Sequence, residues 1–278
     1  FIIENCNPPE EVNSPEEKLA KLFELKVNKE LTPVMLASRY GATDTLEFLL
    51  SKGARIDLVD ELGSNALMLA CENRQLKTAE VLINHGIDIH YTIQQTKWSA
   101  LQIAIRAKSF DLAYLLLRNG AKANSIDMYQ MMPIHWASKF GLVDIIRILI
   151  DYNSEIDPRS KDGWTPLIIA CGYGSLDCVQ LLLDKGAKLD VVDIHGTTPF
   201  MFACMNGNLD IAEFLYSKNQ NINAQDNSGW NALHWACSFD RLPIVKYLLR
   251  INVDYKAKNN NHQTPYDIAR QYSYSDIL

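Results

Sequence analysis

The sequence predicts an all-α protein, a solenoid in which short helix pairs stack one against the next. Three observations predict this fold. Helix-start residues recur at intervals of 33 or 34 residues, an alanine stands five residues after each start, and a glycine or asparagine stands 21 residues after the first seven starts. Each repeat would hold two helices of about two turns, which are unstable alone and must stack on their neighbours.

Composition excludes several classes of function. The 278 residues are 47% hydrophobic and 22% charged, which is typical of an ordered soluble protein. The net charge of −6 makes nucleic acid or an anionic membrane an unexpected main partner. The longest apolar run, over 142–150, is short for a membrane span and contains Asp144 and Arg147. We therefore expect no membrane insertion by this segment.

Residues 1–31 are expected to form a polar lead-in and a capping helix. Ser14 has the pattern of an N-cap, Pro15 suits the first helical position, and Glu17 completes a capping box. Four apolar residues between 19 and 25 lie at helical spacing, which predicts a helix over 15–26 that covers the exposed end of the repeats. The chain starts without Met and stops inside a repeat, which indicates a piece of a longer polypeptide or an incomplete chain.

The repeat region spans 32–278. Its helix starts are Thr32, Asn65, Ser99, Met132, Thr165, Thr198, Asn231 and Thr264. All but Met132 are suitable N-cap residues, and proline or alanine follows each start. The invariant alanines are Ala37, Ala70, Ala104, Ala137, Ala170, Ala203, Ala236 and Ala269. Alanine in every repeat indicates that neighbouring helices approach too closely there for a larger side chain.

The helix-start motif reads TPVMLA, NALMLA, SALQIA, MPIHWA, TPLIIA, TPFMFA, NALHWA and TPYDIA in successive repeats. This series resembles the TPLHxA motif of the ankyrin repeat, and the resemblance covers about 30–278. It implies paired helices followed by a β-hairpin-like finger. The 34-residue interval adds one residue to the finger within 85–98, where IQQTKW replaces the usual turn. Asp267 in the last motif is typical of a C-terminal cap.

No motif for catalysis is present: GxSxG, HExxH, a phosphate-binding loop and GxGxxG after a strand are all missing from the sequence. His135 and His234 occupy the same motif position. A general base or a metal ligand is one interpretation. We favour the other, which the resemblance implies, in which the ring nitrogens bridge to the loop backbone of the adjacent repeat. We expect no enzyme activity, no cofactor and no metal.

The cysteines favour packing over chemistry. Cys71, Cys171, Cys204 and Cys237 directly follow the invariant alanine, so neighbouring ones should be separated by a helix–helix distance of about 8–10 Å. That distance exceeds what a disulfide or a zinc site allows. Cys178 is also predicted to be structural, and Cys6 is expected to be exposed. Free buried cysteines indicate a reducing compartment, so we expect a cytoplasmic protein, in the cytosol or on the cytoskeleton.

The resemblance implies that variable residues of the fingers and of the first-helix ends bind a protein or peptide. The predicted partner-binding residues are Trp164, Tyr173, Tyr129, Phe140, Met131, Asp162, Lys139, Trp98, Arg106, Trp230, Phe239, Tyr40 and Arg39. Aromatic, Met and Arg side chains are enriched in interface cores. Trp164, Tyr173, Tyr129 and Phe140 come from adjacent repeats and are expected to cluster. We interpret Trp136 and Trp235, inside the motif, as packing residues.

Several alternatives stay open. Some ankyrin domains bind methylated lysine in an aromatic cage; Trp230 and Trp235 match that pattern, whereas Ser238 and Ile268 depart from it. Others are hydroxylated at a finger asparagine, a slot occupied by Asn124 and Asn223, for which turn hydrogen bonding is a sufficient explanation. The array could also be the targeting part of a larger enzyme, such as a palmitoyltransferase, or of an ion channel, or a structural subunit of a large assembly.

Overall fold

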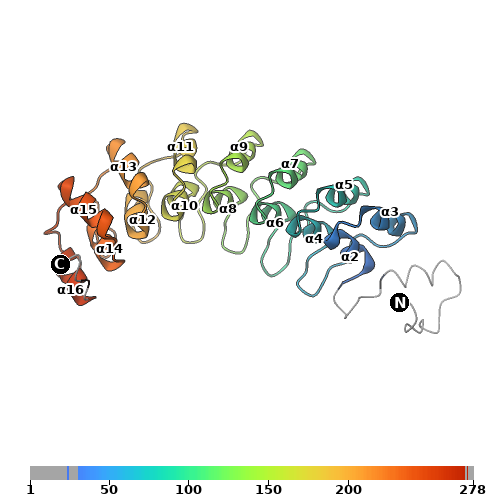
Figure 1. Ribbon diagram of the computed structural model, residues 1–278, viewed down its shortest axis with the longest axis horizontal. Coiled ribbons are helices and arrows are strands. Elements are labelled where there is room, and N and C mark those ends of the chain that lie inside the picture. Colours follow the sequence, from blue (N-terminus) through green and yellow to red (C-terminus); the bar gives the residue numbers. More distant parts are fainter. Residues whose placement is uncertain (1–23, 25–30, 273, 275–278) are drawn as a thin grey trace. The chain divides into compact units, whose positions relative to one another are not determined.

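The computed structural model describes residues 24, 31–272 and 274, and this part of the chain is built from helices (Figure 1). Over these residues fifteen α-helices occur, and β structure is limited to isolated bridges, such as those between Val59 and Asn65 and between Thr92 and Ser99. The predicted all-α fold of helix pairs is confirmed. The predicted helix over 15–26 lies outside the described residues, apart from Glu24, which is helical.

Each of the first seven repeats contains a first and a second helix, and the eighth has a first helix within the described residues. The first helices have seven or eight residues: α2 (Pro33–Tyr40), α4 (Ala66–Glu72), α6 (Ala100–Arg106), α8 (Pro133–Lys139), α10 (Pro166–Tyr173), α12 (Pro199–Asn206), α14 (Ala232–Ser238) and α16 (Pro265–Gln271). The second helices have nine: α3 (Thr43–Ser51), α5 (Leu76–Asn84), α7 (Phe110–Arg118), α9 (Val143–Asp151), α11 (Leu176–Asp184), α13 (Leu209–Ser217) and α15 (Leu242–Arg250).

Side-chain caps start the first helices. In seven of the eight, the Thr, Ser or Asn before the helix accepts a hydrogen bond from the backbone N–H three residues on, as Thr165 Oγ1 does from Ile168 at 3.3 Å. Met132 makes no such side-chain bond. Its own backbone N–H instead donates to Nδ1 of His135 at 2.9 Å, so that imidazole ties down the start of α8.

In the first seven repeats, the turn after the first helix has a residue in the left-handed region. Gly174 has φ +83° there, and Arg74, Lys108 and Asp240 occupy the same place at φ +57°, +55° and +53°. A side chain in this region is strained, yet these three residues adopt it. The stacking of the repeats therefore imposes the turn, whatever residue the sequence supplies.

The invariant alanines lie in the core, each 5% exposed or less. The carbonyl of Ala170 also accepts the backbone N–H of Ser175 at 3.1 Å, which closes the end of α10. The described chain divides into two compact units, 1–128 and 129–278. Within unit 1, α4 packs between α2 and α6; within unit 2, α10, α12 and α14 each pack between two first helices. Close helix approach thus explains why only alanine stands at this position.

The fingers form a hydrogen-bonded series in unit 2. Within a finger, the N–H of Asp226 donates to the carbonyl of Trp230 at 2.9 Å. Between fingers, backbone bonds of 2.8–3.1 Å join Lys161 to Tyr129, Ile194 to Asp162, Asn227 to His195 and Asn260 to Ser228. These bonds make the fingers of unit 2 one platform beside the first helices.

In unit 1 the longer finger keeps a closed turn. Ile93 donates to Trp98 at 3.0 Å and accepts from Lys97 at 2.7 Å, with Lys97 at φ +59°. Unit 1 also has a bond between fingers, since Met128 donates to the carbonyl of Thr96 at 2.9 Å.

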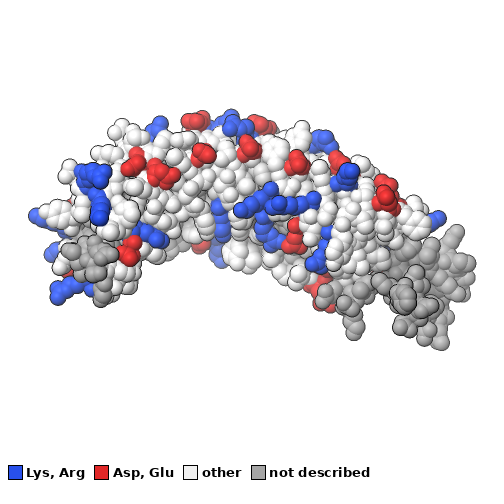
Figure 2. Space-filling view, viewed as in Figure 1, with Lys and Arg blue, Asp and Glu red and all other residues white. Residues whose placement is uncertain are grey.

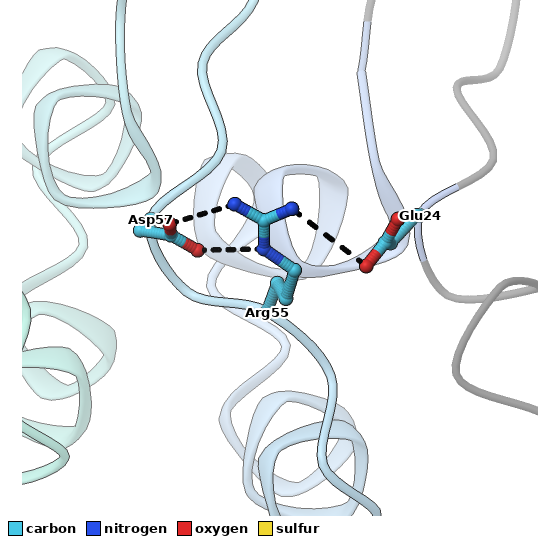
Figure 3. Close-up of polar contacts among 3 residues, drawn as sticks. All are labelled: Glu24, Arg55 and Asp57. Carbon is cyan, nitrogen blue, oxygen red and sulfur yellow. Dashed lines mark hydrogen bonds and ion pairs between the residues drawn. The ribbon is translucent and has the colours of Figure 1, made fainter. Parts of the chain in front are cut away.

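Most charged side chains are at least partly exposed, whereas Asp127, Asp193 and Asp226 are buried. Figure 2 shows acidic and basic side chains on the visible face, with uncharged surface between them. In unit 1, Arg55 binds both carboxylate oxygens of Asp57, at 3.0 and 2.8 Å, and lies 3.9 Å from Glu24 (Figure 3). The hydrogen bond from Arg55 lowers the pKa of Asp57. No helix of the described chain is long and apolar enough to cross a membrane.

Candidate functional site

Unit 1 contains four of the predicted partner-binding residues, as two cation–aromatic pairs. The guanidinium of Arg39 lies 6.0 Å from the ring centre of Tyr40, whose side chain is 72% exposed. The guanidinium of Arg106 lies 4.8 Å from the ring centre of Trp98 and donates to Glu72 at 2.7 Å. In both pairs a cation of this chain already covers the aromatic ring.

The first part of unit 2 contains a third such arrangement. The ammonium of Lys139 lies 5.0 Å from the ring centre of Trp136 and 5.2 Å from that of Tyr173. Phe140 stacks on Trp136 at 6.1 Å between ring centres. Tyr173 and Tyr129 are both about half exposed, at 55% and 51%. The structure thus brings together Lys139, Phe140 and Tyr173, three predicted residues, around Trp136.

Farther along unit 2, Trp164 lines a groove between the fingers and the first helices. Its ring meets Phe202 edge to face at 5.9 Å between centres. The groove has a volume of about 490 Å³ and is lined by Asp162, Trp164, Asp193, His195, Thr197, Phe202, Met205, Asp226, Ser228 and Trp235. We call it the aromatic groove. Its walls come from three successive fingers and from α12 and α14, so the repeat stack alone assembles it.

The aromatic groove adjoins a second hollow of about 320 Å³, lined by Ser228, Trp230, Trp235, Asn260 and Asn261. Trp235 lines both. Its ring centre lies 4.7 Å from that of Trp230 and 6.2 Å from that of Phe239, and its indole N–H donates to Asp226 at 3.0 Å. The carboxylate thereby fixes the orientation of Trp235.

The structure corrects one sequence-based interpretation and extends another. Met131, a predicted partner-binding residue, is only 8% exposed and belongs to the core. Trp235, interpreted as a packing residue, does pack on Trp230 and Phe239, but it is only half-buried and also lines the groove. Phe202 was not predicted. The rings of Phe202 and Trp235 occupy the fifth position of the motif, which in two other repeats is a buried aliphatic residue, Ile103 or Ile169. An aromatic side chain is longer than these and reaches past the core, so an aromatic at that position was the available signal.

The two motif histidines are structural. Nε2 of His135 lies 3.1 Å from the carbonyls of both Pro158 and Trp164, and Nε2 of His234 lies 3.1 Å from that of Gln263. These carbonyls belong to the following loop and finger. Both rings are fully buried, and burial lowers the pKa of His234. This is the bridging role that we favoured from the sequence.

Five cysteines, Cys71, Cys171, Cys178, Cys204 and Cys237, are free and buried. Burial raises the pKa of Cys71 and Cys237 to about 12 and raises that of the other three as well. Such thiols are poor nucleophiles. Cys6 lies outside the described residues, and in the part that is described no group of three or more His, Cys, Asp or Glu is arranged to hold a metal ion.

A stack of helix pairs, with a platform of fingers and a groove of half-buried aromatic rings, defines a helical repeat protein. Family comparison then identifies the repeat: ankyrin repeats, described as three copies, match residues 12–93, 90–162 and 134–226, and a second ankyrin-repeat description, of many copies, matches 207–249. The chain belongs to the ankyrin-repeat family. Repeats of this family generally mediate protein–protein interaction, and family members of this kind are typically non-catalytic.

Individual proteins show the same likeness. A probable 26S proteasome regulatory subunit p28 of Saccharomyces cerevisiae is 29% identical over 144 residues, which cover 50% of this chain and 63% of the yeast protein. Human ankyrin repeat and SOCS box protein 6 is 29% identical over 140 residues, 50% of this chain and 33% of that protein. The chain therefore spans between a third and two thirds of these relatives. The crystal structure of the human ASB11 ankyrin repeat domain has a TM-score of 0.68 at 28% identity and covers 73% of this chain and 90% of that one.

Proposed function

We propose that this chain is a non-catalytic module that binds a protein or peptide segment in the aromatic groove. The observation that supports this most is the exposure of the groove's rings: Trp164, Phe202 and Trp235 are only half-buried although they line one hollow. Half-buried aromatic rings on an otherwise well-packed surface are typical of interface anchors. Tyr173 and Phe239, at 55% and 44% exposure, extend the apolar surface along the ends of α10 and α14.

The mechanism is preorganisation. Backbone bonds between neighbouring fingers and the bond from Trp235 to Asp226 already hold the groove's walls in place. A partner therefore meets rigid rings, and little conformational entropy of this chain is lost on binding. We also propose a cytoplasmic setting, which the buried free thiols support.

The test is affinity purification with mass spectrometry, comparing the wild-type chain with a Trp164→Ala/Tyr173→Ala variant and with Trp235→Ala. We expect both variants to lose a specific partner, each ring being worth about 1–3 kcal/mol of binding free energy at an interface. Tyr152→Ala is the matched control, because Tyr152 is an exposed aromatic residue that caps the second helix α9. A partner that all three variants retain, with their folds intact by circular dichroism, would show that the groove is not the binding surface.

A second candidate is a subunit of a large stable assembly, favoured by the similarity to the proteasome regulatory subunit p28. That role predicts burial of second-helix surfaces as well as of the groove. Hydrogen exchange on the purified native complex distinguishes the two: protection confined to fingers and first helices supports the groove proposal, and protection that extends over α9, α11 and α13 supports the assembly.

A further inference from the structure

The aromatic groove differs from the rest of the array in one respect: the chain's own cations do not fill it. Seven residues after the helix start, repeats one, three and four carry Arg39, Arg106 and Lys139. Each of these cations lies over an aromatic ring of its own unit, at 4.8–6.0 Å from the ring centre. The same position in repeats five, six and seven is Gly172, Met205 and Ser238.

The rings of Trp164, Phe202 and Trp235 are half-buried, so part of each ring stays accessible. Trp164 and Phe202 meet edge to face, and Trp235 packs at an angle against Trp230, so neither arrangement is a closed parallel stack. The face of an aromatic ring carries negative electrostatic potential, which favours a cation above it. At Lys139 the chain itself shows this geometry, with one ammonium between Trp136 and Tyr173.

The polar lining of the groove has the matching charge. Three carboxylates, Asp162, Asp193 and Asp226, line it, and lysine and arginine are absent from the lining. The carboxylates of Asp193 and Asp226 also accept finger backbone N–H groups, as in the bonds of 2.8 and 2.9 Å to Thr197 and Trp230. Asp162 is exposed at its finger tip, and its carboxylate has no ion pair or hydrogen bond among the described residues.

Arg159 and Lys161, the basic residues that precede Asp162 in its finger, do not place a positive charge inside the groove. The guanidinium of Arg159 donates to the carbonyls of Gly163 and Val192, at 3.2 and 2.7 Å. Lys161 is exposed and does not line the groove.

We propose that the aromatic groove accepts an arginine or lysine side chain from a basic segment of the partner. The cation lies against Trp164, Phe202 and Trp235, in the role that Lys139 plays in its own repeat, and Asp162 pairs with it. This inference rests on the proposed function and specifies the chemistry of the partner. Asp193 and Asp226 are already buried and hydrogen-bonded in the free chain, so the exposed charge of the groove is that of Asp162. Charge complementarity selects this occupant, because a neutral apolar peptide would cover the carboxylate of Asp162 without giving it a counter-charge.

The experiment selects a random peptide library, displayed on phage, against the full chain, and then measures synthetic selected peptides by fluorescence anisotropy. We expect the selected peptides to be enriched in Arg or Lys. Replacing that residue by Gln in the peptide should weaken binding about tenfold, and so should Asp162→Asn in the protein, as expected for a charge-assisted contact. Binding should also weaken as NaCl is raised.

The sharpest variant is Met205→Lys, which places a lysine in the groove at the register of Lys139. The chain's own ammonium then competes for the rings, so binding of basic peptides should fall by about tenfold or more. Met205→Leu controls for the loss of the thioether, and Glu213→Gln, on the exposed side of α13, controls for the loss of one negative charge. Circular dichroism melting checks that each variant folds.

The outcomes separate this inference from the function on which it rests. Selected peptides without Arg or Lys that still lose affinity in Trp235→Ala would support the groove and overturn the cationic occupant. Basic peptides that bind Asp162→Asn and Met205→Lys as tightly as wild type would also overturn it. A library that yields no peptide sensitive to Trp235→Ala would overturn both proposals.

Discussion

At the scale of single residues, the same position in successive repeats carries different side chains that perform one task. His234 accepts the backbone N–H of Asn231 through Nδ1 at 3.2 Å, and Gln102 accepts that of Ser99 through Oε1 at 2.9 Å. Both side chains are fully buried. The difference between them is that histidine can take up a proton, whereas glutamine cannot.

His234→Gln should therefore flatten the dependence of stability on pH. Burial holds the pKa of His234 below its usual value of about 6.5, so the unfolded chain binds the proton more tightly. His234 contributes fully to stability above about pH 6.5, and this contribution is lost as the pH falls toward the lowered folded-state pKa, with a slope of up to about 1.4 kcal/mol per pH unit. Urea titrations between about pH 7.5 and pH 5 measure this slope. An unchanged slope in the variant would show that His234 is not the group responsible.

At the scale of the helix, α10 is weakened by a glycine in its interior, and the structure shows what surrounds that glycine. Gly172 lies inside α10 and next to the groove. A Cβ placed there would lie 3.5 Å from the ring of Phe202, an ordinary van der Waals distance. Two residues later, Gly174 ends the helix at φ +83°, and a Cβ there would lie 2.9 Å from Asn208 Oδ1. A side chain therefore fits at Gly172 but not at Gly174.

Gly172→Ala should raise the free energy of unfolding by about 0.5–1 kcal/mol, because alanine loses less backbone entropy in a helix. Gly174→Ala is the matched control and should lower it by about 1 kcal/mol or more, since alanine is strained at positive φ. The midpoints of urea denaturation measure both changes. A lower midpoint for Gly172→Ala would mean that the approach of α10 to α12 is tighter than the structure indicates.

At the scale of the whole chain, five buried thiols report on the integrity of the stack. Cys71 lies in unit 1 and the others in unit 2, so together they sample both. We expect a short pulse of iodoacetamide at neutral pH to leave all five unmodified in the native protein, because their pKa values are raised by burial. The same pulse in urea should label all five. Mass spectrometry of tryptic peptides gives the result, and labelling of Cys171 under native conditions would contradict its assignment to the core.

The repeat and its register could be predicted from the sequence. The helix starts depend on local backbone chemistry, and the invariant alanine recurs in every repeat at a constant distance from them, so the spacing could be read directly. The family and the structural roles of His135 and the cysteines followed from the same register. Trp164 was predicted as an anchor for the same reason, since it stands at a position where the repeat tolerates variation.

Which variable side chains share one surface could not be predicted, because it depends on tertiary packing. The tertiary structure placed Met131 in the core, and it brought Phe202 and Trp235 from the next two repeats beside Trp164. The physical reason is that the groove forms between repeats, so its walls come from side chains more than thirty residues apart in the sequence. How far each aromatic ring extends beyond the core depends on how the neighbouring side chains pack. The lack of a cation at Gly172, Met205 and Ser238 is visible in the sequence. Its relevance to binding follows only from the rings and carboxylates that the structure places around these positions.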